Sequence, residues 1–94
     1  MRVQAGQLYY LELDRGSMPY GQIRRRFVKY EGATNFVLWV CPTDVRLEGL
    51  RRCAERIRHI ALFTTFALAT IDPHAEIWLD YQGGRTALPR EAKR

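Results

Sequence analysis

The chain has 94 residues, of which 47% are hydrophobic and 12% aromatic, and it carries a formal net charge of +5 with a pI near 9.7. This composition excludes a disordered or fibrous chain, and the length allows one small domain with a single core. The basic balance favours an anionic partner, with nucleic acid first and an anionic surface second.

Targeting and redox signals are absent from the sequence. Cys41 and Cys53 are too few for a disulfide framework and are not spaced as Cys-x-x-Cys, so we expect reduced thiols in the core. MRVQAGQ at the N-terminus has no signal-like hydrophobic region, and no run reaches the ~20 apolar residues of a membrane span. We expect a cytoplasmic protein without a membrane partner, with one domain over residues 1–89 and a basic tail over 90–94.

The first third of the chain predicts a hairpin and then a basic helix. RVQAGQLYYLEL has Ala-Gly-Gln between two extended runs, and the second run, near residues 7–13, is apolar on both faces. Ser17 is a potential N-cap, with Pro19 in the first helical turn and Gly32 at the end of the helix. The apolar face of this helix, spaced i, i+4 and i+7, is Ile23, Phe27 and Tyr30.

The rest of the chain alternates between apolar runs and helices. NFVLWVCP predicts a buried strand stopped by Pro42, and Thr43 or Asp44 can cap the helix that follows. HIALFTT predicts a second buried strand, which leads into a short helix capped by Thr64 or Thr65. AEIWLDYQGGRTAL predicts a terminal strand with a turn. In the second helix the apolar stripe is Leu47, Leu50, Ala54 and Ile57, and the other face carries Arg46, Arg51, Arg52, Arg56 and Arg58.

These elements follow the order β(β)-α-β-α-β-(α)-β. Strand–helix–strand units of this size are typical of parallel crossover connections. The sequence therefore predicts a small α/β domain, in which a mixed sheet with parallel central strands is flanked by helices.

Two carboxylates stand at the end of the second predicted strand. Glu12 and Asp14 lie two residues apart, so their side chains point to one face. Open α/β sheets tend to place sites at this end of their strands, and Mg²⁺ needs only one or two protein carboxylates. The pair could hold a metal ion for phosphodiester chemistry. It could equally be a polar strand end, with Asp14 bonded to the turn at residues 15–17.

Basic residues concentrate on the two longer predicted helices. Planar guanidinium groups suit contacts with phosphates, although such residues could equally form the solvated faces of amphipathic helices. The candidate nucleic-acid contacts are Arg15, Arg24, Arg25, Arg26, Lys29, Arg51 and Arg52.

Several segments together resemble the C-terminal region of the replication-relaxation protein family of bacterial plasmids and integrative elements. YYLELDRGSMPYGQIRRRFVKY resembles the family's apolar strand ending in Glu-x-Asp-Arg-Gly-Thr/Ser, followed by a basic helix with a Lys and a closing Tyr. The resemblance continues through FVLWVCPTDVRLEGLRR and LFTTFALATIDPHAEIWLD and so covers nearly the whole chain. The Glu-x-Asp-Arg-Gly-Ser step is its distinctive part.

The resemblance implies a restriction-endonuclease-like core similar to that of PD-(D/E)xK nucleases. Glu12 and Asp14 would lie on its acidic strand, and Arg26 would occupy the position of the family's Lys. An active core needs a further Asp on the preceding strand, but residues 1–6 contain no acid. The Lys of the triplet is absent, and the guanidinium of Arg26 is a poor base. We therefore expect half an active site without turnover, and no cofactor beyond a Mg²⁺ ion at the acidic pair.

Three functional hypotheses follow. The first, which we favour, is a DNA-associated module of plasmid or mobile-element replication or relaxation, with a nuclease-like but inactive core. Full-length family members add an N-terminal winged helix for which this chain has no room, so we expect a truncated or stand-alone copy. The second hypothesis is a Mg²⁺-dependent nuclease completed by dimerisation. The third is a protein-interaction module that forms a homodimer through an edge strand near residues 1–6 or 76–88, without DNA binding.

Overall fold

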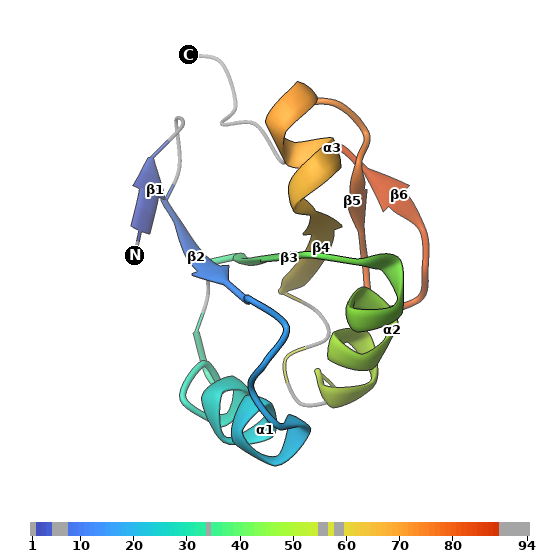
Figure 1. Ribbon diagram of the computed structural model, residues 1–94. Coiled ribbons are helices and arrows are strands. Elements are labelled where there is room, and N and C mark those ends of the chain that lie inside the picture. The colour runs from blue at the N-terminus through green and yellow to red at the C-terminus, as the bar shows by residue number, and fades with distance from the viewer. Residues whose placement is uncertain (1, 5–7, 34, 55–56, 58–59, 89–94) are drawn as a thin grey trace.

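The computed structural model describes residues 2–4, 8–33, 35–54, 57 and 60–88. The elements follow one another as β1 (Arg2–Gln4), β2 (Leu8–Leu13), α1 (Tyr20–Val28), β3 (Val37–Cys41), α2 (Asp44–Cys53), β4 (Ala61–Thr65), α3 (Phe66–Ile71), β5 (Trp78–Leu79) and β6 (Arg85–Thr86) (Figure 1). The predicted alternation of strands and helices is confirmed. The predicted terminal strand is in fact two short strands joined by a turn.

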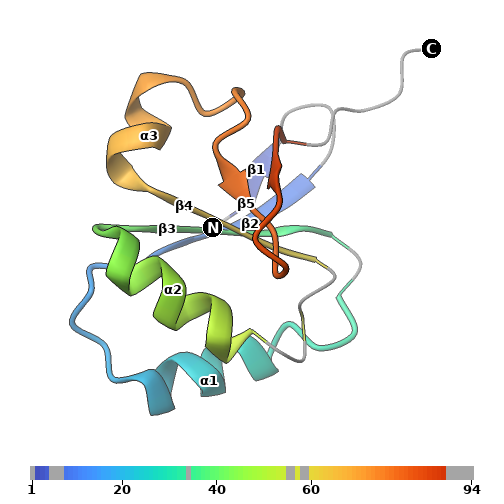
Figure 2. The ribbon, with the colours of Figure 1, turned by 90° about the vertical axis from the view of Figure 1, so that its right-hand side faces the viewer.

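The described strands form one mixed sheet in the order β1-β2-β3-β4-β5-β6. β2, β3 and β4 run parallel, whereas β1, β5 and β6 each pair antiparallel with their neighbours. Because β2-α1-β3 and β3-α2-β4 are successive crossovers of the same hand, both helices lie on the same face of the sheet. Figure 2 shows α1 and α2 together on one side and α3 on the other. A small α/β domain with parallel central strands is thus confirmed.

The sheet separates two apolar layers of unequal size. Every residue of β3 and β4 is buried, with alternate side chains on opposite faces. The larger layer lies under α1 and α2 and includes the whole predicted stripe of α2 and the next turn: Leu47, Leu50, Ala54 and Ile57. The smaller layer lies under α3, which itself has no buried residue. Cys41 and Cys53 are buried free thiols, as predicted.

The N-caps of α1, α2 and α3 test the caps predicted from the sequence. Thr43 caps α2 by accepting a hydrogen bond from the backbone N–H of Arg46, and Thr65 caps α3 in the same way. The predicted cap at Ser17 is wrong, because α1 begins only after Pro19. A residue that precedes proline is disfavoured in the helical conformation, so Met18 cannot serve as the first helical residue.

Some predicted features lie outside the described residues, namely the hairpin turn over residues 5–7, the basic tail over 90–94 and the side chains of Arg56 and Arg58. Within the described part of the chain, no helix combines the length and the apolar character needed to cross a membrane.

Candidate functional site

Glu12, the penultimate residue of β2, faces α1 and accepts hydrogen bonds from Arg26 and Tyr30. Its side chain is 10% exposed. Arg26 Nη1 donates to Glu12 Oε1 at 2.9 Å, and the hydroxyl of Tyr30 donates to Oε2. Burial of this hydroxyl, together with its bond to Glu12, raises the pKa of Tyr30. Tyr30 therefore remains a neutral donor near neutral pH.

Asp14 follows β2 directly and is buried more deeply, with its side chain only 2% exposed. Arg46 of α2 binds both of its oxygens, through Nε at 2.6 Å and Nη2 at 2.8 Å. Nη2 also donates to the carbonyl of Met18 at 2.7 Å, and the guanidinium lies 4.8 Å from the centre of the Tyr20 ring. The bond to Asp14 raises the pKa of Arg46, which keeps the guanidinium charged.

Two predictions about these residues are wrong. Arg46 does not belong to the outer face of α2, because it flanks the apolar stripe on the side of α1, where Gly49 leaves room for Tyr20. The carboxylate of Asp14 does not hold the turn at residues 15–17. It accepts from Arg46 instead, because a planar guanidinium offers two parallel charge-assisted hydrogen bonds.

The sequence reasoning also missed the roles of Tyr30 and Arg46. The only signal for Tyr30 was that the apolar stripe of α1 ends in a residue with a polar tip. Arg46 gave a weaker signal, since it lies between the cap Thr43 and the stripe residue Leu47. Its partner Asp14 is 32 residues away along the chain.

The two carboxylates share a face, as expected, but each is committed to a different helix. All four oxygens accept hydrogen bonds: those of Glu12 from α1 and its C-terminal turn, those of Asp14 from α2. A metal ion at the pair would compete with the donors that these oxygens already accept from. Residues 2–4, 8–33, 35–54, 57 and 60–88 contain no cluster of three or more His, Cys, Asp or Glu side chains that could hold a metal. As found, the pair ties both helices to the sheet.

Four exposed cations of α1, its C-cap and α2 are what we call the outer helix surface. They are Arg24, Arg25, Lys29 and Arg52. None of the four makes an ion pair with another described residue. Lys29 Nζ lies 5.7 Å from the centre of the Tyr30 ring. The charge of Arg24 opposes the burial that raises the pKa of Cys53, which places Arg24 beside α2.

The three other candidate nucleic-acid contacts are not part of the outer helix surface. Arg15 is exposed in the connection between β2 and α1. Arg26, although 43% exposed, is shared with Glu12. Arg51 is only 18% exposed and is bound to Glu48 and to the carbonyl of Tyr81. Five of the seven candidates are thus exposed without an ion pair to a described residue, four of them on the outer helix surface, and two are engaged internally.

No protein-family model matches this chain, and neither the curated proteins nor the solved structures include a match to it. The interpretation of the site therefore depends on its geometry and on the sequence patterns.

Proposed function

We propose that this chain is a nucleic-acid-associated module that binds the phosphate backbone of DNA through the outer helix surface and does not cleave it. One observation carries the proposal. The cations of the outer helix surface are exposed and unpaired among the described residues, whereas Glu12 and Asp14 are neutralised inside the fold by Arg26 and Arg46. Because α1 contains no acidic residue, its exposed cations suit a polyanion.

Within this proposal the domain is a restriction-endonuclease-like core of the replication-relaxation type, from a plasmid or mobile element. The acidic strand followed by a basic helix supports this assignment, as does the contact between Arg26 and Glu12. Arg26 stands where the family's Lys is expected. Because its guanidinium keeps its proton, it neutralises Glu12 and cannot readily act as a base. This substitution supports binding without turnover.

Titration of labelled duplex and single-stranded DNA at about 50 and 200 mM salt, followed by fluorescence anisotropy, tests the proposal. We expect binding that weakens steeply with salt. Arg25→Gln should lower the slope of log affinity against log salt by about 1, the value for one lost phosphate contact. Arg85→Gln removes the same charge from an exposed residue of β6 and should leave the slope unchanged. Absence of binding at the lower salt concentration would refute the proposal.

The shared face of Glu12 and Asp14 favours a second candidate, a Mg²⁺-dependent nuclease whose site is completed by a second copy or by DNA. Incubation of the same DNA with Mg²⁺ or Mn²⁺ separates the two functions. We expect intact DNA. Cleavage that depends on the metal and disappears in Glu12→Ala would establish the nuclease instead.

The sheet edges favour a third candidate, a homodimerisation module. β1 and β6 are the outermost strands of the described sheet, and edge strands can pair with another chain. Light scattering over a range of protein concentrations, with and without DNA, tests this function. A concentration-dependent dimer that is indifferent to DNA would favour it over DNA binding.

A further inference from the structure

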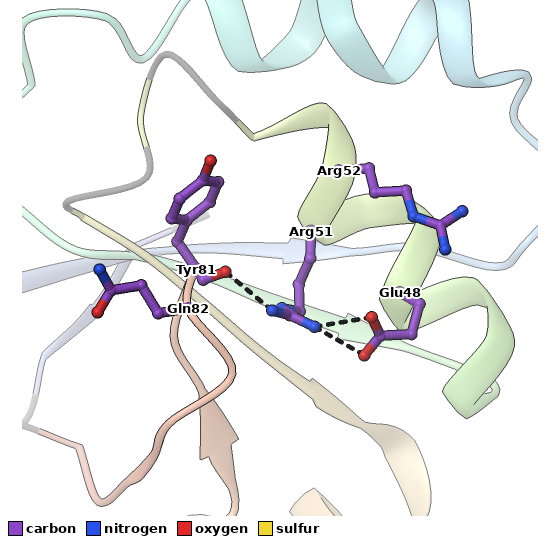
Figure 3. Close-up of a pocket in the computed structure, with 5 residues that line it drawn as sticks. All are labelled: Glu48, Arg51, Arg52, Tyr81 and Gln82. Atoms are coloured by element: carbon purple, nitrogen blue, oxygen red, sulfur yellow. Dashed lines mark hydrogen bonds and ion pairs between the residues drawn. The ribbon is translucent and has the colours of Figure 1, made fainter.

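A polar pocket lies between α2 and the turn that joins β5 to β6. Its volume is about 620 Å³. The residues that line it, shown in Figure 3, are Glu48, Arg51, Arg52, Tyr81 and Gln82. Apart from Arg52, these residues are not part of the outer helix surface. The pocket therefore shares only Arg52 with the surface that the proposed function uses.

Arg51 is fixed between the helix and the turn. Its Nη1 donates to both carboxylate oxygens of Glu48, at 2.7 and 2.8 Å, and its Nη2 donates to the carbonyl of Tyr81 at 2.9 Å. Gly83 allows this close approach, because it has a φ of +91° and a Cβ there would lie 3.3 Å from Nη2. The Nε of Arg51 is buried and has no partner among the described residues. The guanidinium is thus held in one orientation without using all of its donors.

Hydrogen-bond donors dominate the wall of the pocket. Arg52 is exposed and makes no ion pair with a described residue, and Gln82 is exposed at the turn. Among the lining residues Glu48 is the one acid, and Arg51 already occupies both of its oxygens. Asp80 lies in the neighbouring turn, where its Oδ1 accepts from the backbone N–H groups of Gln82 and Gly84. Such a wall suits a ligand that offers only acceptors, as a phosphate does.

We propose that this pocket binds a phosphate group and that Glu48 is its internal competitor. The side chain of Glu48 is 49% exposed, and exposed ion pairs add little to stability, so a phosphate can replace its carboxylate on Arg51. Arg52 on α2 and Gln82 on the turn are then the other lining side chains that can donate hydrogen bonds to the phosphate. The phosphate can belong to a free nucleotide or to a nucleic-acid backbone.

Titration with inorganic pyrophosphate, followed by amide chemical shifts, tests the pocket. We expect the largest shifts at residues 51–52 and 81–84. Glu48→Gln should tighten binding about fourfold, the effect of one unit charge at about 5 Å in water, and Arg52→Gln should weaken it by a similar factor. Arg25→Gln is the control, because it removes the same charge from α1. The proposal is refuted if shifts do not appear in the pocket, or if Arg25→Gln weakens binding as much as Arg52→Gln.

Gln82→Ala distinguishes the two sources of phosphate, using thymidine monophosphate and a single-stranded oligothymidine as probes. If Gln82→Ala weakens binding of the monophosphate alone, the ligand of the pocket is a free nucleotide. If it weakens binding of both probes, the ligand is a backbone phosphate. Unchanged binding of both contradicts the pocket. The two proposals can fail separately, because Arg25→Gln should reduce duplex binding without affecting pyrophosphate.

Discussion

Asp14 and Arg46 are the most deeply buried ion pair among the described residues, with side chains 2% and 10% exposed. Each charge has lost most of its water and depends on the other for compensation. A buried pair of this kind is not strongly stabilising by itself, but removing one partner leaves an unpaired buried charge. The stability of the fold should therefore be sensitive to a single substitution at either Asp14 or Arg46, which join the end of β2 to α2.

Arg46→Met should lower the free energy of unfolding by about 3–5 kcal/mol, because Asp14 is left buried and charged. Adding Asp14→Asn removes that charge, so the double variant should lose less than the sum of the two single variants. Urea denaturation followed by circular dichroism measures all three. Glu48→Gln, in the exposed pair with Arg51, is the control and should cost at most about 1 kcal/mol. Strict additivity of the two buried substitutions would contradict the argument.

At the level of elements, Tyr20 at the start of α1 covers Gly49 of α2. A Cβ built on Gly49 would overlap the hydroxyl of Tyr20. The same tyrosine lies against Arg46, so its position also supports the bond from α2 to β2. Glycine within a helix is destabilising relative to alanine by about 1 kcal/mol, and here it allows the helix contact.

The effect of Gly49→Ala on the free energy of unfolding should therefore differ between the wild type and the Tyr20→Ala variant. In Tyr20→Ala, where the space is empty, it should raise the free energy of unfolding by about 1 kcal/mol through helix propensity. In the wild-type background the gain should be smaller, because Tyr20 must leave its place over Gly49. Thermal and urea denaturation of the four proteins measure the difference. Equal gains in the two backgrounds would show that Tyr20 does not restrict Gly49.

At the scale of the whole molecule, four groups among the described residues acquire their charge with difficulty in the folded state. Burial raises the pKa of Tyr9, Tyr30, Cys41 and Cys53. For Cys41, burial and then the nearby charge of Asp14 raise the pKa to about 11 from its ordinary 9.0. A raised pKa means that the folded state holds the proton more tightly. This contribution to stability is complete below the unfolded pKa and is lost as the pH rises through the folded one.

The free energy of unfolding should therefore fall between about pH 9 and 11, and ionisation of Cys41 should contribute up to about 1.4 kcal/mol per pH unit to this fall. Cys41→Ala removes one of these groups, so its stability should decline less steeply over the same interval. Urea denaturation at several pH values measures both slopes. Parallel slopes for the wild type and Cys41→Ala would mean that Cys41 does not resist ionisation.

Local signals in the sequence were enough to predict the alternation of strands and helices and the apolar stripe of α2, and they narrowed each of two helix caps to a pair of neighbouring residues. They also predicted that Glu12 and Asp14 share a face, because alternation along a strand depends only on neighbouring residues. The partners of these carboxylates could not be predicted. Arg26 is 14 residues from Glu12 and Arg46 is 32 from Asp14, so both contacts depend on how the helices are placed over the sheet. The pocket could not be predicted for the same reason, because it lies between α2 and a turn whose residue Tyr81 is 30 residues beyond Arg51.

The weak cover that α3 gives to the second face of the sheet has a consequence for local unfolding. α3 has no buried residue, and it borders an apolar cavity of about 400 Å³ that also contacts Leu38 and Trp78. Detaching α3 uncovers the smaller apolar layer but leaves the larger layer under α1 and α2 packed, so it requires less free energy than unfolding the whole domain. The face of the sheet under α3 should therefore open more readily than the face under α1 and α2. A ligand on the outer helix surface would contact the half of the molecule that stays closed while α3 opens.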